Sequence, residues 1–401
     1  MDSDTNANAA ASNWFGINRA TLAVLVAIGG LGLSEEIWRS YFGIHLKSET
    51  GDILQLAVYA VFVNFLEGFG YIIGGTVAHK LGARTALAVS ALPVAIGFAV
   101  MLSVNDPWFL VAGALLITNW EPLSVPATFD VVGSELPKNR RTIAFAMQSI
   151  QKRVPKIIGP LIGGLAFMKG FKLNIALSLG ILGISVLTQI FLLNRMKPKP
   201  ESKYVPLKEV LRDMPPDLRM LLSAEILLRW GDWFVRDFAG VYVVFYLNQP
   251  SRSYGQWVAL TSATALITYI PVGKLVDKAP SPKPYIGLTF LLFSLFPICL
   301  VLLPKSGMPI GVALAITFVI NGLRELGEPA RKAMIASGFP PEVRARAVGL
   351  YWGLRSFAFF PAPIIAYLLW QHFGPDATFL IGGGIGLLGT AWFWFRVQCR
   401  N

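Results

Sequence analysis

The sequence predicts an all-α polytopic membrane protein, with twelve transmembrane helices arranged as two pseudo-symmetric bundles of six. Three observations predict this fold. Hydrophobic residues make up 54% of the 401 residues and charged residues only 14%, whereas a soluble domain carries about 25% charged residues. The apolar residues gather in segments long enough to span a bilayer, which takes roughly 20 residues. Finally, the two halves of the chain carry matching residues at a nearly constant offset.

The predicted spans follow one another with short connections, and one longer break separates the sixth from the seventh. This break, residues 195–218, is rich in proline and charge. We therefore expect a cytoplasmic linker between an N-terminal bundle, residues 1–194, and a C-terminal bundle, residues 219–401. The spans are predicted at residues 17–43, 54–78, 84–104, 108–132, 142–167, 171–194, 219–247, 254–276, 283–304, 308–334, 345–371 and 376–397.

The basic residues indicate the orientation of the chain. Of the 35 lysines and arginines, 21 lie in the even-numbered loops, at the span ends that border them or in the C-terminal tail, and five lie in or beside the odd-numbered loops. This asymmetry predicts that the even loops and both termini lie on the cytoplasmic side of the membrane. We expect that membrane to be an inner membrane of bacterial type. The net charge of +12 is thus explained by topology, and we expect no nucleic-acid partner.

Three segments of the first half recur in the second. Glu35 and Arg39 in the first span match Asp232 and Arg236 in the seventh, at an offset of 197 residues. The ends of the second and eighth spans match at an offset of 198, and the loops before the fifth and eleventh spans at 203. Duplicated halves are typical of secondary transporters, whose binding site lies between the repeats.

The match at the end of the second span resembles a family signature. That signature begins with Gly, any three residues and Asp. A basic residue (Arg or Lys), any one residue, a second Gly and further basic residues follow. The first copy here consists of Gly75, His79, Lys80, Gly82 and Arg84, and the second of Gly273, Asp277 and Lys278. With these motifs the chain resembles the major facilitator superfamily, although His79 stands where the family has Asp. The resemblance implies two bundles that rock about a central cavity and a cytoplasmic latch formed by these residues.

Charged residues inside the spans are the candidates for function, because a lone charge in a bilayer is costly and therefore faces a protein interior or a water-filled cavity. Glu35 and Arg39 are four residues apart and share a helix face, as do Asp232 and Arg236. We expect each pair to act as a gate or as a proton-accepting carboxylate beside its arginine. The alternative is an ion pair that only fastens the bundles together.

Lys152 and Arg355 lie near mid-depth at equivalent positions of the two repeats. Two cations facing one cavity repel unless an anion lies between them, and the planar guanidinium of arginine suits carboxylate or phosphate. This favours an anionic substrate. The alternative is permanent pairing with Glu121, Glu67 or another buried acid.

The remaining candidates fall into two groups. Arg324, Glu325 and Glu328 are expected at the cavity or an inner gate, and Glu225 and Arg229 are expected to form a pair at the cytoplasmic surface. The predicted substrate contacts are Lys152, Arg355, Arg39, Arg236, Arg324, Trp120 and Trp233. The predicted proton-coupling or gating residues are Glu35, Glu36, Asp232, Glu121, Glu325, Glu328 and Glu67.

No phosphate-binding loop, metal cluster or nucleophile–base set occurs in the sequence, so we expect neither an enzyme nor a cofactor or metal. The predicted function is a monomeric, proton-coupled transporter of a small anion, with the solute, protons and the lipid bilayer as its partners. Efflux of amphipathic or cationic compounds and lipid translocation remain open as transport alternatives. A non-transporting membrane sensor or scaffold is the alternative from another class.

Overall fold

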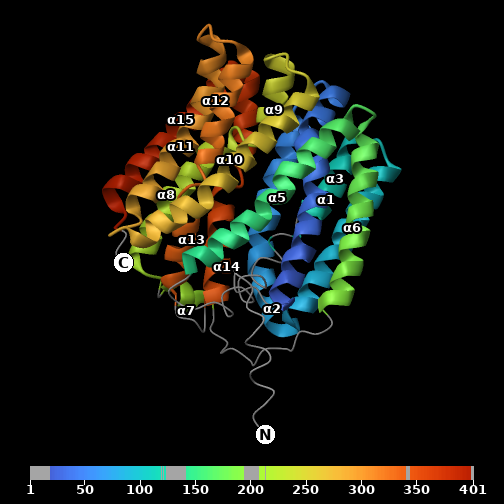
Figure 1. The fold of residues 1–401 in the computed structure, drawn as a ribbon. Helices are drawn as coiled ribbons and strands as arrows, with labels where there is room; N and C mark the ends of the chain where they lie inside the picture. Colours follow the sequence, from blue (N-terminus) through green and yellow to red (C-terminus); the bar gives the residue numbers. More distant parts are fainter. Residues whose placement is uncertain are drawn as a thin grey trace.

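A computed structural model describes residues 19–118, 120, 122, 141–193, 207–212, 214–339 and 344–398 (Figure 1). These residues form helices and no strand, as expected for spans whose backbone groups must bond within their own segment. The helices before the linker are α1 (Arg19–Thr50), α2 (Leu54–Ser103), α3 (Pro107–Thr118), α5 (Arg141–Phe167) and α6 (Phe171–Leu193). The helices from the linker onward are α7 (Leu207–Arg212), α8 (Pro216–Trp233), α9 (Ala239–Val241), the π-helix η2 (Tyr242–Tyr246), α10 (Ser251–Lys278), α11 (Lys283–Leu302), the 3-10 helix η3 (Leu303–Lys305), α12 (Ile310–Leu323), α13 (Glu328–Ser337), α14 (Arg344–Phe359) and α15 (Ala362–Arg396).

We call α1 to α6 the N-terminal half and α8 to α15 the C-terminal half. In the first, α1 packs on α5 and α6, and α2 packs on α3; in the second, α15 packs on α8 and α11. The two halves meet where α5 lies against α10 and α2 lies against α14 (Figure 1). We call the end of the molecule that carries α7 the linker end, and the opposite end the far end.

Six of the described helices are long and apolar enough to cross a membrane. The helix α2 covers the second and third predicted spans, and the predicted loop between them is helical. The helix α15 joins the eleventh and twelfth predicted spans across Gly374, whose φ of 82° breaks the helix. A positive φ strains any residue with a Cβ, so glycine suits this position.

Three predicted spans of the C-terminal half are interrupted, and there the sequence prediction of continuous helices was wrong. Turns separate α8 from α9 at residues 234–238, α12 from α13 at residues 324–327, and α14 from α15 at residues 360–361. The last break precedes the helical turn that Pro361 begins, because a proline disfavours helical geometry in the residue before it. By contrast, α1 and α5 of the N-terminal half run without a break.

Cross-half contacts close the far end. The carboxylate of Asp52, between α1 and α2, accepts hydrogen bonds from Gln371 Nε2 at 2.7 Å and from the Tyr367 hydroxyl at 3.1 Å, both on α15. Nearby, the Tyr41 hydroxyl of α1 donates to the Pro160 carbonyl of α5 at 2.8 Å. Gly255 of α10 packs directly against this bond, and a Cβ there would overlap both oxygens.

Gly255→Val is therefore expected to destabilise the closed far end by forcing α10 away from α1 and α5. Overpacking of this kind costs about 1–3 kcal/mol, so the apparent melting temperature of the detergent-purified protein should fall. Gly180→Val is the matched control, since a Cβ on that α6 glycine meets nothing within 4 Å. Equal melting temperatures for the two variants would contradict the tight packing at Gly255.

Candidate functional site

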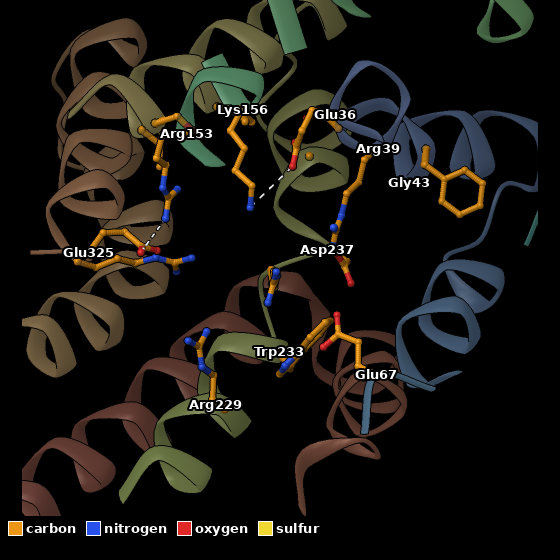
Figure 2. Close-up of a pocket in the computed structure, with 18 of the residues that line it drawn as sticks. Glu36, Arg39, Gly43, Glu67, Arg153, Lys156, Arg229, Trp233, Asp237 and Glu325 are labelled. Carbon is orange, nitrogen blue, oxygen red and sulfur yellow. Dashed lines mark ion pairs between the residues drawn. The ribbon is translucent and has the colours of Figure 1, made fainter. Parts of the chain in front are cut away.

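A cavity of about 340 Å³ lies between the two halves (Figure 2). Nine basic and five acidic side chains line it. The bases are Arg39, Arg153, Lys156, Arg229, Arg236, Arg324, Arg331, Lys332 and Arg355, and the acids are Glu36, Glu67, Asp237, Glu325 and Glu328. Three further acids, Glu35, Glu225 and Asp232, pair with lining arginines, which leaves one more base than acids.

On α1, Glu35 and Arg39 form the predicted pair at 2.5 Å. The other oxygen of Glu35 accepts a hydrogen bond from the indole nitrogen of Trp120 at 2.9 Å. Glu35 is buried, whereas Arg39 lines the cavity together with Glu36, whose carboxylate lies 3.7 Å from Lys156 Nζ. The α1 helix therefore exposes Arg39 to the cavity, whereas its partner Glu35 is buried in the protein.

A second ion pair crosses between the halves. Arg153 Nη2 of α5 lies 2.7 Å from Glu325 Oε2, in the turn after α12 (Figure 2). The Tyr269 hydroxyl of α10 accepts from Arg153 Nε at 3.2 Å and donates to Glu325 at 3.3 Å. Because Arg153 and Glu325 belong to different halves, any separation of the halves at this point must break the pair.

Asp232 belongs to a group within the C-terminal half. Its two oxygens lie 2.9 Å from Arg324 and 3.1 Å from Arg229. Both guanidinium groups also face the ring of Phe293, with Cζ 4.2 Å and 4.8 Å from its centroid, respectively. Cation–π contact of this kind adds to the ion pairs where water is excluded.

Glu225 binds two arginines at the linker end of the cavity. It pairs with Arg331, which also lies 2.6 Å from Glu328, and it lies 3.3 Å from Arg355. The predicted pairing of Glu225 with Arg229 is wrong, because Arg229 turns toward Asp232 instead. Arg355, which we expected to face an anion together with Lys152, has an internal partner in Glu225.

Arg236 and Asp237 lie in the turn that interrupts the seventh span, and both line the cavity. The predicted pairing of Asp232 with Arg236 is wrong. The Arg236 backbone N–H still donates to the Asp232 carbonyl at 2.9 Å, but the Asp232 carboxylate binds Arg324 and Arg229. Instead, the Arg236 guanidinium stacks over the Trp233 ring at 4.8 Å. Within the described part of the chain, Arg236 is the cavity arginine that has no carboxylate within ion-pair distance.

The sequence prediction missed Asp237 and Tyr269. Asp237 carried a signal, since it is an acid inside an apolar span directly after Arg236. Tyr269 carried none, because only the packing of α10 against α5 brings its hydroxyl to Arg153. Of the two predicted tryptophans, Trp233 lines the cavity and Trp120 lies behind Glu35.

Part of the predicted site lies outside the described residues. This holds for Glu121, whereas for Lys152 and most residues of the predicted latch only the helical backbone is described: Gly75, His79, Lys80, Gly82, Arg84 and Asp277. Of the second latch copy, Gly273 is buried in α10, and Lys278 is exposed where that helix ends. Glu67 lies on the cavity wall, near Trp233 in Figure 2.

Glu225→Gln is expected to destabilise the protein, because it leaves Arg331 and Arg355 without their shared carboxylate inside the molecule. Removing one partner of a buried ion pair costs about 3–5 kcal/mol. The apparent melting temperature in detergent measures the loss. Glu209→Gln on the exposed face of α7 is the control and should leave the melting temperature unchanged. An unchanged melting temperature for Glu225→Gln would contradict the pairing of Glu225 with Arg331 and Arg355.

Comparisons with known proteins agree with this architecture. The family model for the Major Facilitator Superfamily matches residues 15–249 and 226–398. The multidrug resistance protein MdtH of Shigella boydii serotype 4 (strain Sb227) is 24% identical over 329 residues, covering 81% of this chain and 74% of the relative. The multidrug resistance protein MdtG of Escherichia coli (strain SMS-3-5 / SECEC) is 21% identical over 336 residues, covering 82% and 80%.

Among solved structures, a POT family transporter in complex with 5-aminolevulinic acid superposes with a TM-score of 0.74. It is 14% identical in sequence, and the match covers 95% of this chain and 96% of that one. An identity this low shows a shared fold and leaves the solute open. The chain belongs to the Major Facilitator Superfamily and is a multi-pass membrane transporter rather than an enzyme.

Proposed function

We propose that this transporter moves a small solute with an anionic group, and that the anionic group binds Arg236. One observation carries the proposal: Arg236 lines the central cavity and has no carboxylate within ion-pair distance among the described residues, whereas the other six cavity arginines have one. A guanidinium that contacts an aromatic ring and has no carboxylate partner keeps its N–H groups available for a carboxylate or phosphate. The interrupted helix around it is the kind of segment that forms binding sites in secondary transporters.

We further propose that transport is coupled to protons through Glu325. Protonation of Glu325 would release Arg153 and weaken a contact that joins the halves. A proton that binds one arrangement of the halves more tightly than the other shifts the balance between them. The distribution of basic residues supports an orientation with both termini in the cytoplasm.

Multidrug efflux is the second candidate, and the names of the relatives favour it. An exporter of lipophilic cations needs a largely apolar cavity wall. The fourteen charged side chains on the cavity wall, with nine bases among them, fit a hydrophilic solute better.

The two candidates separate in a binding experiment on the purified protein. We expect benzoate or 3-phenylpropionate to raise the melting temperature of the parent protein and to bind Arg236→Ala more weakly. The loss of a hydrogen bond to a charged group is about 1.5–3 kcal/mol, or roughly a tenfold to hundredfold lower affinity. Arg396→Ala is the matched control, since Arg396 stacks on Trp392 at 5.4 Å outside the cavity. Stabilisation by tetraphenylphosphonium instead, equal in the parent and in Arg236→Ala, would favour multidrug efflux.

Glu325→Gln is expected to abolish proton-driven accumulation of the solute but to leave solute-for-solute exchange intact. The variant can still bind the solute and change between the two arrangements of its halves, but residue 325 can no longer take up and release a proton. Proteoliposomes with an imposed pH gradient measure both accumulation and exchange, using whichever of benzoate and 3-phenylpropionate stabilises the protein more. Glu328→Gln is the control, since Glu328 pairs with Arg331 inside one half. Proton-driven accumulation by Glu325→Gln would rule out the proposed coupling residue.

A further inference from the structure

Asp237 has no role in the function proposed so far. Among the described residues, its carboxylate makes no hydrogen bond or ion pair, although it lines the same cavity wall as Arg236. Figure 2 shows its carboxylate beside the end of the Arg39 side chain, which reaches toward it from the other half. Asp237 is half-buried and its carboxylate has no bonded partner among the described residues, so it is available to a ligand in the cavity.

The local fold presents the two opposite charges together. Residues 234–238 form the turn between α8 and α9, and the Cα atoms of Arg236 and Asp237, as neighbours in the chain, are about 3.8 Å apart. Arg236 is held over the Trp233 ring.

This arrangement distinguishes a zwitterion from a simple anion. An anion bound to Arg236 would lie near the negative charge of Asp237 and be repelled by it. A positively charged group on the same solute turns that repulsion into attraction and gives the carboxylate its partner. The charges that face Asp237 from other segments are Arg39 on α1 and Asp232 on α8, with the hydroxyls of Tyr59 on α2 and Tyr254 on α10 nearby.

Resting on the proposed function, we propose that the solute is a small zwitterion whose carboxylate binds Arg236 and whose ammonium group binds Asp237. An amino acid has its two charges joined through one carbon, which matches two charged side chains from adjacent residues. The cavity volume of about 340 Å³ lies within the usual range for small-molecule sites. It leaves room for a side chain as large as an aromatic ring.

Two matched triplets of probes test this in the unmodified protein. The first is phenylalanine, 3-phenylpropionate and 2-phenylethylamine; the second is alanine, propionate and ethylamine. Each triplet keeps the carbon skeleton and removes one charge at a time. We expect the zwitterion of at least one triplet to bind more tightly than its anion and its cation by roughly tenfold, the value of one hydrogen bond to a charged group. Calorimetric titration of the purified protein measures the dissociation constants.

Asp237→Asn should remove this preference, so that the zwitterion binds no more tightly than its anion while the anion binds as well as before or better. Asp106→Asn is the control; Asp106 lies in the exposed loop before α3, where asparagine also caps a helix. Absence of a zwitterion preference in both triplets overturns the inference from the parent protein alone, even if Asp237→Asn does not fold.

The outcome also separates this inference from the function on which it rests. If 3-phenylpropionate binds the parent, loses affinity in Arg236→Ala and is matched by phenylalanine, the anion site stands and the zwitterion assignment is wrong. If the anions bind Arg236→Ala and the parent equally well, the proposed function itself is wrong.

Discussion

The charges inside this protein must be neutralised by other groups of the protein, because the bilayer offers them neither water nor counterions. This constraint organises the cavity. Asp232 holds Arg229 and Arg324, Glu225 holds Arg331 and Arg355, and both acids lie behind the cavity wall. The wall therefore consists largely of cations whose partner acids lie beneath the surface, and a charge without such a partner stands out as available to a ligand.

The ion pairs differ in whether they join the halves. The groups around Asp232 and Glu225 connect α8, α13 and α14 of the C-terminal half and can move with that half as one unit. The pair of Arg153 with Glu325 joins α5 to the turn after α12, and Asp52 joins the far end of the N-terminal half to α15. Contacts of the first kind stabilise a half, whereas contacts of the second kind hold one arrangement of the two halves.

The halves are also unequal in their backbone. The C-terminal half interrupts its cavity helices at residues 234–238 and 324–327, and these turns carry Arg236, Asp237, Arg324 and Glu325. In the N-terminal half, Arg39 and Arg153 project from the unbroken helices α1 and α5. Among the described residues, the charged residues on which both proposals rest, Arg236, Asp237 and Glu325, therefore lie in turns between helices of the C-terminal half.

The sequence by itself determined the membrane-spanning class, the family motifs and the residue types of the site, because hydropathy over roughly 20 residues and charges within apolar segments are local properties. It also placed Glu35 beside Arg39, since a continuous helix fixes the four-residue spacing. Only the tertiary structure decided which charges meet. The Asp232 carboxylate pairs with Arg324 instead of Arg236, and Arg355 pairs with Glu225, because contacts between segments distant in the chain, such as α8 with α14, bring these groups together.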